Sequence, residues 1–231
     1  MLSLENFSIG HNKVPLILDF TAQVLPGEAI GMIGLNGVGK TTMLESISGF
    51  KKPLNGNCYY GNQLINELCA AERAQIFSYL FSKNEINLEL TGFEVLKFSS
   101  LPLNVFSSHL EEETIKKIEK ITKLFKLDDF IDQKIAHISD GQRQKILLAR
   151  AFMHDGPIIF LDEPTIYLDL YFKADIVSII NRIKKEMNKI VIFVSHDEKF
   201  LDSVADKFWL FDSKSNKVHV SDKKYAELDL Y

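Results

Sequence analysis

Short apolar runs recur along the chain, each rich in branched or aromatic side chains and bounded by turn-forming or charged residues. Such runs are typical of strands that are buried on both faces of a sheet. The predicted strands are residues 29–33, 157–161, 190–194 and 208–211. Between them, residues 172–187 show a helical period. Strands that alternate with helices predict an α/β fold with a parallel sheet.

The helical period of residues 172–187 separates an apolar face from a charged one. Lys184, Lys185 and Glu186 are expected to face solvent. The residues expected to face the core are Phe172, Ile176, Ile179, Ile180, Ile183 and Met187.

The middle of the chain, residues 89–153, has a mostly helical pattern and is predicted to be a helical insertion. Within it, one helix face carries Ile115, Ile118, Thr122 and Phe125, and the lysines expected to face solvent are Lys116, Lys117, Lys120 and Lys123. Those lysines could form a docking surface, but a solvated helix face is the more common meaning of such a row. Residues 101–103, Leu-Pro-Leu, are interpreted as a helix stop.

Composition narrows the class of protein. The chain has 231 residues, of which 46% are hydrophobic, enough for a substantial core in one compact domain or two closely joined ones. A net charge of −4 makes nucleic acid an unexpected partner. Two cysteines indicate no disulfide framework and favour a reducing cytosol. We also expect neither a secretion signal nor a membrane-spanning helix.

A glycine-rich segment follows the first predicted strand. Residues 34–41 read Gly-Leu-Asn-Gly-Val-Gly-Lys-Thr, which matches the P-loop pattern, and a helical stretch begins at Thr42. Glycines let successive backbone N–H groups surround phosphate oxygens, and the helix that follows presents its positive end to the same anion. Lys40 is expected to reach the β and γ phosphates, and Thr41 to coordinate Mg²⁺. The alternative is a glycine-rich turn without a ligand.

Two carboxylates follow the strand at 157–161. Asp162 is expected to hold Mg²⁺ and Glu163 to polarise the water that attacks the γ phosphate. Without the P-loop, this pair could equally be a helix cap. His196, after the strand at 190–194, is placed to donate to the γ phosphate, although a histidine at a strand end is usually structural.

Together with residues 138–142, Ile-Ser-Asp-Gly-Gln, these motifs make the whole chain resemble an ABC-type nucleotide-binding domain. Residues 34–42 resemble the Walker A loop, residues 139–142 the ABC signature, residues 158–163 the Walker B strand, and residues 168–169 the D-loop. His196 resembles the switch histidine. Five motifs in one order carry the resemblance.

The resemblance implies a fold and a division of the chain. The fold is a P-loop NTPase (RecA-like) core with an N-terminal antiparallel β subdomain and an inserted α-helical subdomain. The single domain, 1–231, would comprise the core and β subdomain in residues 1–82 and 157–231. The helical signature subdomain would be residues 83–156.

The resemblance also implies ATP and Mg²⁺ as ligands, with the signature of one subunit closing over the ATP of its twin. The implied partners are a second copy of the chain, transmembrane permease subunits and, indirectly, a substrate-binding protein. The resemblance places the chain in the cytoplasm, as a peripheral subunit on the cytoplasmic face of the membrane. The implied catalytic residues are Glu163, His196 and Lys40, and the metal ligands are Thr41, Asp162 and Ser82. The implied nucleotide-binding residues are His11, Asn36, Gly37, Val38, Gly39, Lys40, Thr41, Thr42, Ser139, Gly141, Gln142 and Asp169.

Flanking residues narrow the resemblance further. Residues 4–11, 95–97 and 165–170 look most like the ATPases of iron-siderophore, haem and vitamin B12 importers. These flanking segments do not contact the cargo in the implied arrangement, so they suggest it only indirectly.

Three positions depart from the family pattern. Ser82 replaces a glutamine that contacts Mg²⁺ and relays its state to the membrane subunit, so coupling could be weaker, with Asn84 or a water as substitute. Asp140 replaces a signature glycine and is expected to point away from the nucleotide. His11 replaces an aromatic residue that stacks on adenine, and a surface histidine is nearly as good an interpretation.

Two alternatives to a transporter ATPase are an ATP-dependent dimerising switch with weak hydrolysis and a non-transport ABC protein.

Overall fold

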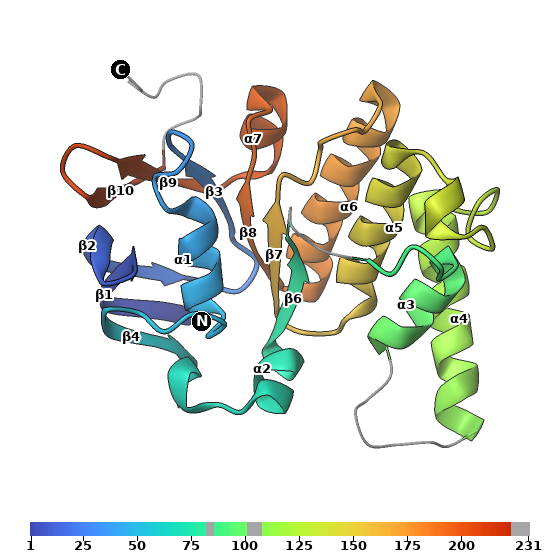
Figure 1. Cartoon of the computed structure of the whole chain (residues 1–231), viewed down its shortest axis with the longest axis horizontal. Helices are drawn as coiled ribbons and strands as arrows, with labels where there is room; N and C mark the ends of the chain where they lie inside the picture. Colours follow the sequence, from blue (N-terminus) through green and yellow to red (C-terminus); the bar gives the residue numbers. More distant parts are fainter. Residues whose placement is uncertain (82–85, 101–107, 223–231) are drawn as a thin grey trace.

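The computed structural model describes residues 1–81, 86–100 and 108–222. Its central element is a six-stranded sheet (Figure 1). Five of the strands run parallel, and β10 joins one edge antiparallel. In spatial order the strands are β10 (Lys217–Ser221), β9 (Lys207–Asp212), β3 (Ala29–Ile33), β8 (Ile190–Val194), β7 (Ile158–Asp162) and β6 (Phe77–Leu80).

The predicted parallel sheet is confirmed. The strands expected at residues 29–33 and 190–194 have those bounds, and every residue of β7 and β8 is buried. β7 begins one residue later than predicted and extends to Asp162, so this carboxylate is part of the strand end itself.

A second, antiparallel sheet stands beside the first, in the order β2-β1-β4-β5. Its strands are β1 (Leu2–His11), β2 (Val14–Val24), β4 (Asn55–Tyr60) and β5 (Gln63–Leu64). Helix α1 (Lys40–Ile47) shares one core cluster with strands of both sheets. The implied antiparallel β unit at the N-terminus is therefore present.

Among the described residues between β6 and β7, three helices gather at one end of the molecule (Figure 1). They are α3 (Gly92–Ser100), α4 (Ser108–Phe125) and α5 (Asp140–Met153), with a short 3-10 turn η2 (Ile135–His137). This confirms the predicted helical middle. α3 ends at Ser100, and the helix stop predicted at 101–103 lies outside the described residues.

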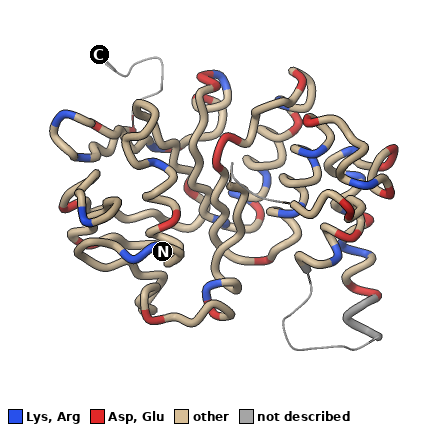
Figure 2. The backbone as a smooth tube through the Cα atoms, in the orientation of Figure 1, with Lys and Arg blue, Asp and Glu red and all other residues tan. Residues whose placement is uncertain are grey.

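The remaining helices pack around the parallel sheet or connect the sheets. They are α6 (Leu170–Met187), α7 (Glu198–Val204), α2 (Ala70–Ile76) and the 3-10 turn η1 (Ile65–Glu67). In the described part of the chain, no helix has the length and hydropathy to cross a membrane. Figure 2 shows basic and acidic residues interspersed along the described chain, in line with its small net charge.

Three residues on the predicted helix faces do not lie where they were expected. Lys184 is only 6% exposed, because its ammonium donates to the Val204 carbonyl at 2.8 Å and pairs with Asp206 at 2.8 Å. A buried cation is tolerated where it has such acceptors. Met187, expected in the core, is 55% exposed since α6 ends there, and Ile115 on α4 is also exposed.

Candidate functional site

The P-loop connects β3 to α1 through glycines in unusual backbone conformations. Gly37 and Gly39 have φ angles of 80° and 111°, a region that side-chain-bearing residues rarely adopt. The ammonium of Lys40 donates to the carbonyl oxygens of Gly34 at 2.6 Å and Leu35 at 3.0 Å. Burial lowers the pKa of Lys40, although Glu163 and Asp162 act in the opposite direction. The loop thus holds the Lys40 ammonium on two of its own carbonyl oxygens.

Thr41 and Asp162 meet at the edge of the sheet, as predicted. The Thr41 hydroxyl donates to Asp162 Oδ2 at 3.2 Å, and Asp162 is 4% exposed. Mg²⁺ prefers such oxygen donors, and usually takes one or two carboxylates together with phosphates and water. Among the described residues, no group of three or more His, Cys, Asp or Glu side chains could hold a metal. The pair fits a Mg²⁺ ion whose remaining ligands would come from phosphate oxygens and water.

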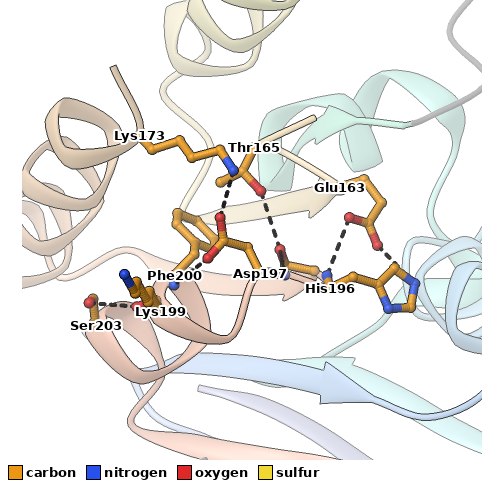
Figure 3. Close-up of polar contacts among 9 residues, drawn as sticks. Glu163, Thr165, Lys173, His196, Asp197, Lys199, Phe200 and Ser203 are labelled. Carbon is orange, nitrogen blue, oxygen red and sulfur yellow. Dashed lines mark hydrogen bonds and ion pairs between the residues drawn. The ribbon is translucent and has the colours of Figure 1, made fainter. Parts of the chain in front are cut away.

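Glu163 follows Asp162 in a strained turn. Its φ is 53°, in the left-handed region. Oε2 accepts a 3.4 Å hydrogen bond from the backbone N–H of His196, and Oε1 lies 3.4 Å from His196 Nε2 (Figure 3). Burial raises the pKa of Glu163, opposed by His196. A half-buried carboxylate next to a histidine is suited to accept a proton from water.

Gln144 supports this turn through hydrogen bonds to its backbone. The sequence did not lead us to expect this role. The side chain lies on α5, is 7% exposed, and donates to the carbonyl oxygens of Glu163 and Pro164, both at 3.3 Å. The available signal was an amide side chain on the apolar face of an amphipathic helix, which needs buried acceptors.

These residues surround a cavity of about 890 Å³, a volume typical of sites for small ligands. Nine predicted residues line it: Asn36, Gly37, Gly39, Lys40, Thr41, Thr42, Asp162, Glu163 and His196. It is also lined by residues that were not predicted for it: Thr165, Ile166, Tyr167, Leu168, Lys173, Val194 and Asp197.

Other predicted residues lie outside this cavity. Val38 is buried in the core behind the loop, and His11 is exposed at the end of β1, opposite Val14. Asp169 caps α6 by accepting from the Phe172 N–H at 2.8 Å. Ser82, like Asn84, falls outside the described residues.

The four signature residues, 139–142, form the N-cap and first turn of α5 and do not line this cavity. Ser139 and Gln142 form a capping box, in which the Ser139 hydroxyl accepts from the Gln142 N–H at 3.2 Å. A Cβ on Gly141 would lie 2.8 Å from the Tyr167 carbonyl oxygen, so only glycine fits there. The Asp140 carboxylate lies 3.4 Å from an Arg143 guanidinium nitrogen, and its side chain is 64% exposed.

Comparison with known proteins gives a consistent result. Residues 17–166 match the model of the family described as "ABC transporter". The petrobactin import ATP-binding protein YclP of Bacillus subtilis is 29% identical over 89% of this chain and 81% of its own length. The spermidine/putrescine import ATP-binding protein PotA of Legionella pneumophila is 26% identical over 91% of this chain and 56% of its own length.

Among solved structures, the dimeric structure of MJ0796, a bacterial ABC transporter cassette, superimposes with a TM-score of 0.84. It is 25% identical to this chain, and the match covers 96% of this chain and 98% of that one. The two sheets and the helices between β6 and β7 therefore form a known architecture.

Proposed function

This chain belongs to the ABC transporter family as an ATP-binding and ATP-hydrolysing subunit, and from that premise we propose that it powers import of an iron-siderophore, haem or cobalamin-type chelate through a separate membrane subunit. One observation carries the site assignment. Lys40, Thr41, Asp162, Glu163 and His196, from the ends of three neighbouring strands, line a single cavity.

The P-loop supplies the grip on the triphosphate. Its backbone N–H groups and the N-terminus of α1 favour an anion at the carboxyl edge of the sheet. Lys40 exchanges its bonds to the Gly34 and Leu35 carbonyls for β and γ phosphate oxygens. Thr41 and Asp162 would hold Mg²⁺, and that ion would supply positive charge to balance the charge that develops on the phosphates.

Hydrolysis then uses the second half of the cavity. Glu163 orients a water and takes its proton while the water oxygen bonds to the γ phosphorus. The bond from that phosphorus to the β–γ bridging oxygen breaks, which leaves ADP and inorganic phosphate. His196, 3.4 Å from the Glu163 carboxylate, donates to the γ phosphate.

Two copies of the chain complete two such sites. Ser139 is exposed at the N-terminus of α5 and lies outside its own chain's cavity, which supports its use on the nucleotide of a twin chain. Exposed apolar side chains flank the cavity and need cover in a working assembly: Tyr167, Leu170 and Tyr171 are 67%, 73% and 85% exposed.

The cargo assignment rests on fewer observations than the site assignment. Residues 4–11, 95–97 and 165–170 resemble chelate importers, and YclP is a petrobactin import protein, whereas PotA, with similar identity, imports polyamines. Selectivity for cargo belongs to the membrane and substrate-binding partners. We place the chain on the cytoplasmic face of the membrane, bound to the permease.

The site assignment is tested with Glu163→Gln. The amide slows proton removal from water but keeps the shape of the cavity, so Mg-ATP should trap the variant as a dimer in size-exclusion chromatography. Glu163→Gln combined with Lys40→Ala is the control and should stay monomeric. A Glu163→Gln chain that binds Mg-ATP and remains monomeric contradicts the shared site.

The cargo is tested separately. The chain is purified together with the membrane protein that accompanies it and reconstituted in vesicles with Mg-ATP on the side of this chain. Uptake of a ferric siderophore, haem or cobalamin supports the proposal, and uptake of spermidine alone refutes it.

A further inference from the structure

Lys173 is a second lysine at the nucleotide cavity, and the roles assigned so far leave it unused. It lies on α6, where its N–H donates to the carbonyl oxygen of Asp169 at 3.0 Å. Its ammonium lies 2.7 Å from Asp197 Oδ2 (Figure 3). Both residues line the cavity. The pair joins the segment after β7 to the segment after β8.

Asp197 is fixed from three directions. Its Oδ2 accepts from Lys173, its Oδ1 accepts from the Phe200 N–H at 3.1 Å at the start of α7, and its own N–H donates to Ser195 Oγ at 3.1 Å. Burial raises the pKa of Asp197, but the hydrogen bonds from Lys173 and Phe200 outweigh burial, so that pKa lies below its usual value. The carboxylate is therefore an anchored anion.

His196 stands directly between these anchors. It follows Ser195, whose hydroxyl lies 3.4 Å from the Thr165 hydroxyl, and precedes Asp197. The His196 side chain is 62% exposed and meets Glu163 only at 3.4 Å, so it has few contacts of its own. Its position depends on the backbone on either side.

From this arrangement we propose that Lys173 is a positioning residue for ATP hydrolysis: through Asp197 it holds His196 against Glu163. The same helix begins at Leu170, directly after its cap Asp169, in the segment proposed to face the twin chain. If α6 shifts when the dimer closes, the Lys173–Asp197 ion pair would therefore move His196 of the same chain. This inference rests on the proposed role of His196.

An ordinary ion pair at a protein surface contributes little to stability and nothing to turnover. Lys173 could also contact phosphate directly. The two alternatives and the proposal differ in which kinetic constant changes, since loss of phosphate contact weakens nucleotide binding, whereas a misplaced His196 slows the chemical step.

The test is Lys173→Met in the full-length chain, assayed for Mg-ATP hydrolysis and for nucleotide affinity. We expect kcat to fall about tenfold, with KM and the ATP dissociation constant within about twofold of the wild type. Lys173→Arg should recover most of the rate because it keeps the charge. Lys185→Met, at an exposed position of the same helix, is the matched control and should keep the wild-type rate.

A double-mutant cycle isolates the route. In a His196→Ala background, Lys173→Met should lower kcat by less than about twofold more. A full tenfold loss in that background overturns the proposal, as does an unchanged kcat in Lys173→Met. A rise in KM with kcat unchanged assigns the lysine to phosphate binding and overturns it too. A wild-type chain without Mg-ATP hydrolysis would instead refute the proposed function.

Discussion

Gln144→Met removes the two donated hydrogen bonds beneath the catalytic turn while keeping an unbranched side chain of similar length. The carbonyl oxygens of Glu163 and Pro164, each 3.3 Å from the amide, then lose this partner. Each bond contributes about 1 kcal/mol net, so the variant should lose about 2 kcal/mol of stability. For 231 residues, this corresponds to a fall in Tm of about 4 °C.

Activity should fall as well, because Glu163 occupies a left-handed backbone conformation, with φ at 53°, that its surroundings must maintain. That conformation costs about 1–2 kcal/mol, and a turn that relaxes would misplace the carboxylate. Since 1.4 kcal/mol of barrier is a factor of ten, we expect kcat to fall about tenfold.

The assay is steady-state Mg-ATP hydrolysis, with thermal unfolding followed by circular dichroism. Gln75→Met makes the same substitution at an exposed position of α2 and should leave both quantities near the wild-type values. A Gln144→Met chain with reduced Tm and wild-type kcat would show that the turn keeps its geometry without this support, which would refute the reasoning.

Three further predictions follow from single features. Lys184→Met should lower the free energy of unfolding in urea by about 1–3 kcal/mol, because the Val204 carbonyl loses its partner, while the exposed Lys185→Met should change it by less than about 0.5 kcal/mol. In the native chain at pH 8, a thiol reagent should modify the exposed Cys69 and spare Cys58, since burial raises the pKa of Cys58 to about 12; rapid modification of both would contradict that burial. Ser82→Gln should raise the stimulation of ATP hydrolysis by the membrane partner. If the variant and the wild type have the same ATPase rate, both alone and with the partner, Ser82 does not weaken the coupling.

Much of the catalytic edge could be predicted from sequence because strand ends determine it. The apolar runs fix β3, β7 and β8, and parallel strands bring their following residues to one edge, so Lys40, Asp162 and His196 were expected together. Contacts between helices were harder to predict. The roles of Gln144 and Lys173 depend on how α5 and α6 rotate against the sheet, which a helical period alone does not determine.

The inward position of Lys184 was missed for a related reason. Helical periodicity sorts residues by polarity, yet a long aliphatic stem can lie in the core when its ammonium finds acceptors on a neighbouring element. Those acceptors, at Val204 and Asp206, are separated from it by a whole strand in the chain.

The strands that flank the helical insertion, β6 and β7, are hydrogen-bonded neighbours in the sheet. The 77 residues between them, 81–157, can therefore change in length and sequence while their two attachment points in the sheet stay adjacent. Relatives could in this way adapt to different permeases without rebuilding their ATP pocket. Two requirements limit this variation. Any replacement needs its own equivalent of Gln144, because that amide donates to the turn of Glu163, and its own equivalent of the signature residues 139–142, which are proposed to complete the site of a twin chain.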